Sequence, residues 1–114
     1  MPKFMILFLE GAMDIPDEEL DEVSRAAHVV VDDAREAGVW VFGGGLRHHE
    51  DAATVGLDGS VQEGRAIEDH VYLAGVAVVD VESRADALEW AKRLGAACRC
   101  AMEVREFLPV LRDQ

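Results

Sequence analysis

The sequence has few basic residues, few cysteines and no long hydrophobic run. Its 114 residues include 11 Lys and Arg against 23 Asp and Glu, which gives a net charge of −12 at pH 7. Repulsion from phosphate argues against nucleic acids and anionic membranes as general partners. No unbroken apolar stretch reaches roughly 18 residues, which argues against a membrane span. The length suits one domain, residues 1–114, and a hydrophobic content of 50% indicates that it folds as a soluble globular domain.

Cysteine occurs only as Cys98 and Cys100. Two thiols separated by one residue do not make the disulfide framework of a small secreted protein. A redox pair is an alternative, but two small buried hydrophobes are favoured, because such close neighbours reach poor disulfide geometry. The first residues also lack the apolar run of a signal peptide. We therefore predict a reducing, cytoplasmic location.

Two segments have the pattern of helices. The first begins at Pro16 with three acidic residues in its first turn, carries an apolar stripe at helical spacing and stops at Gly38. The second begins at Ser83, whose hydroxyl is placed to cap it, and is predicted to end at Gly95. Trp40 and Trp90 are predicted to lie in the core or at an interface.

Four segments have the composition of strands in one sheet, and two shorter ones that of a hairpin. The four are residues 4–9, 39–42, 72–81 and 101–107. Asp58-Gly59, a dipeptide favoured in tight turns, separates residues 54–57 from 61–63 and predicts the hairpin. Gly43 to Gly45 follow the second segment, where the backbone can bend or approach another group closely, but no helix with phosphate-binding spacing comes after them.

The order of these elements predicts an α+β fold of the ferredoxin-like βαββαβ type with an inserted β-hairpin. Two helices cover one face of such a sheet. Residues 4–9 and 76–79 are nevertheless apolar on both sides, so the other face needs a cover. A second copy packed sheet against sheet supplies one, and we predict a homodimer.

Several blocks together resemble the YCII-related proteins, particularly their DGPF-domain branch. The blocks are Glu36-Ala37-Gly38-Val39, Gly43 to Leu46, Ala53-Thr54-Val55, Leu73-Ala74-Gly75, Val79-Asp80-Val81, Asp86 to Ala91 and Met102-Glu103-Val104-Arg105. At the place of the branch's signature the chain has Glu63-Gly64-Arg65-Ala66, which keeps only the acid and the glycine. The resemblance implies a dimeric α/β barrel over residues 1–114.

The resemblance also implies a candidate for catalysis. Some YCII proteins are thought to use a His-Asp pair, and a dehydrochlorinase of a hydroxylated aromatic is among their relatives. His28 lies where that histidine falls, whereas Glu36 is nearest the acid's place after a shift of one residue. Asp32 and Asp33 are alternatives. From spacing alone, His28 and Asp32 form an i,i+4 pair able to orient an imidazole for proton transfer, although surface helices often carry such pairs by chance.

A second group of candidates follows the glycine run. Arg47 is suited to binding a carboxylate or phenolate, and His48 to acting as acid or base. Arg65 and His70 are further candidates for substrate binding, with a solvated loop tip and an ordinary interior histidine as their alternatives. A metal site formed by His48, His49 and His70 with Glu50 or Asp69 is not favoured, because consecutive side chains of an extended segment point to opposite sides.

These observations lead to two hypotheses. The first is a cofactor-independent enzyme that does proton transfer or elimination on a small ring compound, aromatic if the resemblance holds, with His28 or His48 as acid or base. The second is a non-catalytic homodimer that binds a small ligand or a protein partner in the same pocket. No metal and no cofactor is predicted.

Overall fold

The computed structural model describes residues 1–64 and 72–109. Its elements, in chain order, are β1 (Lys3–Leu9), a 3-10 turn η1 (Asp17–Glu19), α1 (Leu20–Glu36), β2 (Trp40–Gly45), a 3-10 turn η2 (His49–Asp51), β3 (Ala53–Val55), β4 (Val61–Glu63), β5 (Leu73–Asp80), α2 (Arg84–Cys98) and β6 (Glu103–Glu106). Ser83 caps α2 as predicted, since its Oγ accepts a hydrogen bond from the Asp86 N–H at 3.2 Å. Among these residues no helix is long and apolar enough to cross a bilayer.

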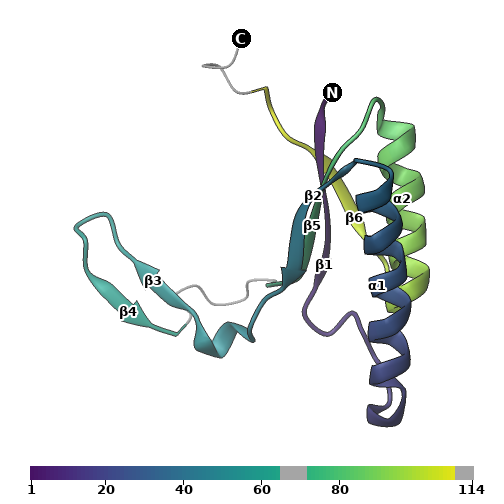
Figure 1. Cartoon of the computed structure of the whole chain (residues 1–114). Helices are drawn as coiled ribbons and strands as arrows, with labels where there is room; N and C mark the ends of the chain where they lie inside the picture. The colour runs from purple at the N-terminus through teal and green to yellow at the C-terminus, as the bar shows by residue number, and fades with distance from the viewer. Residues whose placement is uncertain (65–71, 110–114) are drawn as a thin grey trace.

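The main sheet has the strand order β2-β5-β1-β6, and every neighbouring pair is antiparallel. Both helices lie on one face of it, while β3 and β4 form a separate two-stranded hairpin that extends away from the sheet (Figure 1). The predicted α+β class is confirmed, and the topology is compatible with a ferredoxin-like fold with the hairpin inserted between β2 and β5.

The hydrophobic core lies between the helices and the sheet. Strand register explains which side chains reach it, because Phe4 pairs with Val79 and Ile6 with Ala77, and all four point toward the helices. Leu94 of α2 packs against them. Trp40 and Trp90 pack against this core at its margin, as predicted.

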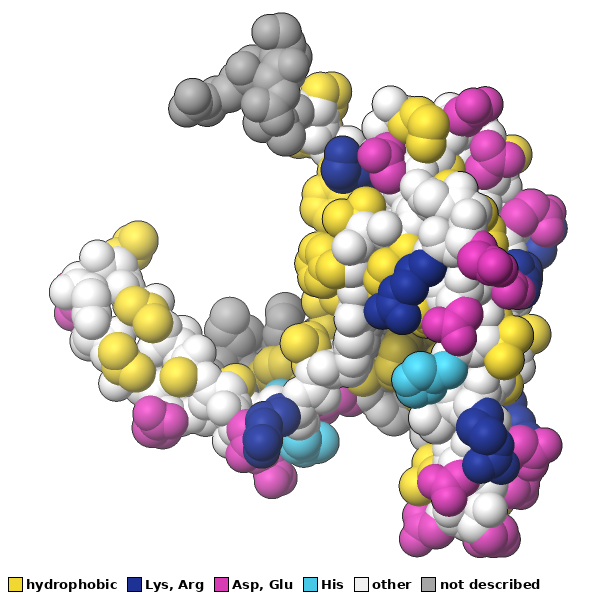
Figure 2. Space-filling view, in the orientation of Figure 1, with side chains coloured by type: hydrophobic (Ala, Val, Ile, Leu, Met, Phe, Trp, Pro, Cys, Tyr) yellow, Lys and Arg dark blue, Asp and Glu magenta, His cyan; other side chains and the backbone are white. Residues whose placement is uncertain are grey.

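The opposite face of the sheet is apolar, and within residues 1–64 and 72–109 no helix lies over it. Met5, Leu7, Val76 and Val78 alternate with the core residues and therefore point to this side. Phe42, opposite Val78, remains 59% exposed. Figure 2 shows apolar side chains on the side of the sheet that looks toward the hairpin.

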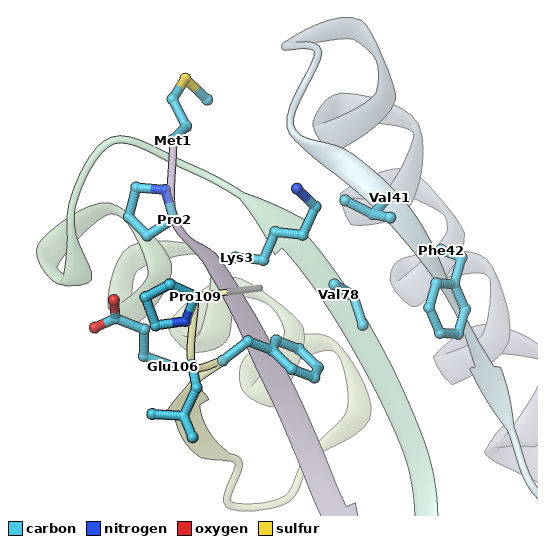
Figure 3. Close-up of a pocket in the computed structure, with 10 residues that line it drawn as sticks. Met1, Pro2, Lys3, Val41, Phe42, Val78, Glu106 and Pro109 are labelled. Atoms are coloured by element: carbon cyan, nitrogen blue, oxygen red, sulfur yellow. The ribbon is translucent and has the colours of Figure 1, made fainter. Parts of the chain in front are cut away.

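A groove of about 520 Å³ runs across this open face. Figure 3 shows that side chains from both edges of the sheet line it. Its wall includes Val41, Phe42, Val78, Phe107 and Leu108, with Lys3 and Glu106 as its charged members. The central strands therefore carry apolar side chains on both faces of the sheet, as expected.

The glycine run differs from its expected position but allows the close approach that was expected of it. Instead of following the strand, Gly43 to Gly45 are its last three residues, paired with Ala77, Val76 and Gly75. A Cβ at Gly43 would lie 2.6 Å from the Trp40 ring and 2.7 Å from the Val76 carbonyl oxygen. Gly43 is thus needed because the indole of Trp40 lies against the strand.

Replacing Gly43 with alanine is expected to destabilise the fold by about 1–3 kcal/mol, the usual cost of overpacking, because the added methyl meets backbone as well as the ring. Gly44 is the matched control, since a Cβ there meets nothing within 4 Å. Urea denaturation of both variants measures the difference. Equal midpoints for G43A and G44A would contradict this account.

Helix α2 passes through Gly95, where its end was predicted, and continues to Cys98. The left-handed residue that ends it is Arg99, with a φ of 58°. The Arg99 guanidinium binds Glu19 and lies 3.8 Å from Glu22, which ties the end of α2 to the start of α1. Arg99 thus adopts the left-handed conformation that glycine often supplies at a helix end, and a long-range ion pair holds its side chain.

Cys98 and Cys100 are free thiols on either side of Arg99. Burial is the main cause that raises the pKa of Cys98, and the neighbouring Cys100 raises it further. A raised pKa means less thiolate at neutral pH, so alkylation by iodoacetamide is expected to be slow at pH 7 and to go on increasing with pH beyond about pH 8.5, where the rate of an ordinary cysteine begins to level off. Comparison with urea-unfolded protein measures this effect, and equal rates at pH 7 would contradict it.

The hairpin forms at the predicted place, with Val55 opposite Val61. Gly59 has a φ of 85°, and the Asp58 carboxylate accepts hydrogen bonds from the N–H and hydroxyl of Ser60. Only the glycine of the Asp58-Gly59 pair adopts a positive φ.

Candidate functional site

The sheet topology brings three distant segments to one edge. Strands β1 and β2 are both antiparallel to β5, which lies between them, so the ends of β1 and β2 lie at the same edge as the start of β5. The Glu10 N–H donates to the Tyr72 carbonyl at 2.8 Å, and the Leu46 N–H to the Ala74 carbonyl at 2.7 Å. These bonds extend the ladder by one residue beyond each strand and fix where Glu10 and the loop after β2 begin.

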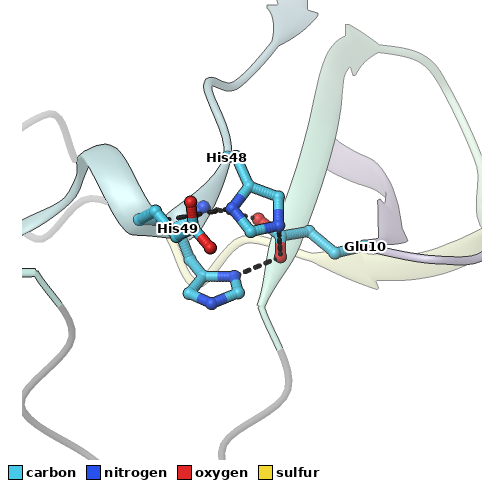
Figure 4. A network of polar contacts seen from close by, with 4 residues as sticks. Glu10, His48 and His49 are labelled. Carbon is cyan, nitrogen blue, oxygen red and sulfur yellow. Dashed lines mark hydrogen bonds and ion pairs between the residues drawn. The ribbon is translucent and has the colours of Figure 1, made fainter.

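That loop changes conformation between its two histidines. His48 is extended, with φ −56° and ψ 149°, and His49 begins the turn η2, closed by the Asp51 N–H donating to the His48 carbonyl at 2.9 Å. The rings of His48 and His49 therefore come together, with centroids 4.1 Å apart, and both face Glu10 (Figure 4). The assumption that consecutive histidines point to opposite sides does not hold here, because the segment is not uniformly extended.

Glu10 accepts two hydrogen bonds from His49. The backbone N–H of His49 donates to Oε2 at 2.8 Å, and its Nδ1 lies 2.5 Å from Oε1. A carboxylate can only accept, so Nδ1 carries the proton and Nε2 of the neutral ring is left with its lone pair. His48 Nε2 lies 3.6 Å from the same Oε1. Glu10 is 19% exposed and His49 21%, whereas His48 is 56% exposed.

These contacts lower the pKa of Glu10. The hydrogen bond from the His49 side chain is the largest cause, and the His49 backbone N–H and the charges of both histidines lower it further, against a smaller opposing effect of burial. Glu10 thus stays a carboxylate to lower pH than an ordinary glutamate. A carboxylate beside an imidazole is suited to orienting the ring and stabilising its protonated form.

The three side chains line an open pocket of about 410 Å³, together with Leu46, Arg47 and Tyr72. The phenol of Tyr72 stacks on His49, with centroids 4.4 Å apart and planes at 13°. Arg47 is 89% exposed and lies 3.8 Å from Asp51. The pocket therefore joins an oriented imidazole, an aromatic wall and a cation at its rim.

The predicted site residues fall in two places. Arg47 and His48 line this pocket. His28 and Asp32 are exposed on α1, where His28 Nδ1 donates to the Ser24 carbonyl at 2.8 Å and Asp32 lies 3.6 Å from Arg35. The two side chains thus contact different residues, Ser24 and Arg35, and neither of them lines this pocket. Arg65 and His70 lie outside the described residues.

Glu10, His49 and Tyr72 were not among the predicted catalytic or substrate-binding residues. One signal points to them. In a βαββαβ fold the first two strands are parallel across the third, so a polar residue ending the first strand lies beside the loop after the second. Glu10 closes the apolar run of residues 4–9, and His48 and His49 begin three residues after Gly45.

Comparison with known proteins adds no further assignment. Neither the models of known protein families nor the curated proteins include a match to this sequence. The resemblance to YCII-related proteins accordingly stays a prediction from the residues.

Proposed function

We propose that this protein is a small enzyme that does acid/base chemistry, proton transfer or elimination, on a small ring compound without a cofactor. The observation that carries this proposal is the Glu10–His49 pair, with Nδ1 2.5 Å from Oε1. It leaves Nε2 of a partly buried imidazole as the basic atom, beside an aromatic side chain that suits a ring.

In the proposed reaction His49 Nε2 takes a proton from the substrate, and Glu10 stabilises the imidazolium that forms. Arg47 at the rim is placed to bind an oxyanion of the substrate, such as a phenolate or carboxylate. His48 is the second acid or base, able to return a proton to the leaving group. His49 thus takes the role that was expected of His28 or His48.

We also propose that the enzyme is a homodimer of the α/β-barrel type, paired through the open faces of its sheets. The apolar groove across that face and the exposed ring of Phe42 support this arrangement. The hairpin supports it as well, because an isolated two-stranded hairpin is marginally stable and its tip exposes Val55, Leu57 and Val61. We place the dimer in the cytoplasm, in keeping with the two free thiols.

A second candidate function is a non-catalytic homodimer that binds a small ligand or a protein partner. The open pocket of about 410 Å³ beside Glu10 supports it, since concave sites of this size take small ligands. In this case the hydrogen bonds of Glu10 serve only to hold the loop after β2.

A panel of hydroxylated and halogenated ring compounds in D₂O separates the two functions. Proton NMR detects both deuterium uptake at carbon and elimination products. We expect turnover by the wild-type protein and its loss, roughly 10²-fold or more, in H49A, with H28A as the matched control that retains it. Binding without turnover across the panel, or turnover that persists in H49A, would contradict the enzyme proposal.

A further inference from the structure

We infer that Glu10, His48 and His49 also form a binding site for a divalent first-row transition-metal ion, of which Zn²⁺ is the representative. Each of the three residues offers one ligand atom, and these atoms lie within 4.8 Å of one another. Glu10 Oε1 is 2.5 Å from His49 Nδ1 and 3.6 Å from His48 Nε2. Two imidazole nitrogens and one carboxylate are the ligands of many catalytic zinc sites and of non-haem iron centres. The inference goes beyond the proposed function and does not rest on it.

The present distances allow such an ion after small side-chain rotations. An ion roughly 2.1 Å from each ligand holds the ligand atoms about 3.0–3.4 Å apart. Glu10 Oε1 is now 2.5 Å from His49 Nδ1 and 3.6 Å from His48 Nε2, so the first distance must open and the second close slightly. The Tyr72 ring stacks on the His49 ring and so restricts its rotation.

Ion binding requires a proton on each ring to change nitrogen. On His49 the proton leaves Nδ1 for Nε2. On His48 the proton moves to Nδ1, which now accepts a hydrogen bond from the Glu50 N–H at 3.3 Å. That bond is long and exposed, so water can take the place of both partners at little cost.

Charge and exposure around the three ligands favour a cation. The chain has a net charge of −12, and Glu10 contributes a carboxylate that accepts hydrogen bonds from His49. The nearest positive side chain along the loop, Arg47, is exposed and paired with Asp51. His48 is 56% exposed, so the side of the site away from Glu10 is open to water, which can complete the coordination.

A metal ion bound at His49 Nδ1 and proton acceptance by His49 Nε2 are mutually exclusive. With a metal on Nδ1, the neutral His49 ring has its proton on Nε2 and cannot accept another there. A bound ion would therefore inhibit proton transfer by His49. Metal binding is measured without substrate, so its failure is distinguishable from failure of the proposed function.

Titration of the metal-free protein with Co²⁺, followed by its visible absorption and by displacement with Zn²⁺, tests the inference. We expect one ion per chain and an affinity lowered roughly tenfold or more in H48A, H49A and E10Q. Loss of a residue that only hydrogen-bonds to a metal ligand already costs about that much, and loss of the ligand itself costs at least as much. H28A, which removes another exposed histidine, is expected to bind as wild type does, and Mg²⁺ is not expected to compete.

The exposed position of His48 makes H48A the variant least prone to unfolding, and circular dichroism confirms the fold of each variant. Wild-type protein without Co²⁺ absorption would overturn the inference. Equal binding by wild type and folded H48A would overturn it as well. A thiolate charge-transfer band in the near ultraviolet would place the ion at Cys98 and Cys100 instead, and would also overturn it.

Discussion

Replacing Glu10 with glutamine is expected to lower the rate of the proposed proton transfer roughly 10²-fold or more while leaving substrate affinity nearly unchanged. Glutamine has the same size, but it is neutral and its amide can donate. An amide N–H facing His49 Nδ1 would move the imidazole proton to Nε2, which removes the base. Glu10 thus acts as a positioning residue for His49, which it touches at 2.5 Å.

A purely structural role of Glu10 would not change the tautomer of His49. The ¹⁵N chemical shifts of the imidazole report that tautomer directly, and we expect them to show the proton on Nδ1 in wild type and on Nε2 in E10Q. H28A is the control for both measurements. A wild-type rate in E10Q would show that the pair takes no part in the reaction.

The strands and helices were largely predictable because their signals are local. Residues 4–9 are an unbroken apolar run, and α2 has its cap at Ser83, so neighbouring residues determine both elements. The bounds that differ depend on distant contacts. Gly43 to Gly45 belong to β2 because they pair with residues 75–77 of β5. Helix α2 passes Gly95 and ends before Arg99, whose guanidinium binds Glu19 in the turn that precedes α1.

The candidate site was predictable only in part, for the same reason. Arg47 and His48 could be identified because they follow a glycine-rich strand end. Glu10 and His49 are 39 positions apart. They come together only because β1 and β2 lie on either side of β5 and end at the same end of the sheet. His28 and Asp32 have the right spacing for a pair, but on an exposed helix each has a closer partner.

Changing Phe42 to aspartate is expected to convert the proposed dimer to a monomer. Phe42 is 59% exposed in the single chain, so the change costs little folding stability, yet it would place a charge in the middle of the proposed interface. Aromatic anchors at interface centres contribute about 2–4 kcal/mol, which is roughly a 30- to 1,000-fold change in dissociation constant.

Sedimentation velocity at micromolar concentration distinguishes the two states. Val29 is the matched control, because it is exposed to a similar degree, 57%, but lies on α1, on the other side of the molecule from the open sheet face. We expect dimers for wild type and V29D and monomers for F42D. A monomeric wild type would contradict the pairing of the sheets, whereas dimers in all three proteins would mean that a different surface joins them.

Because η2 leads directly into β3, a hairpin that changes environment on dimerisation would also alter the pocket at its base. We therefore expect F42D to lose activity together with the dimer even though its Glu10–His49 pair is intact.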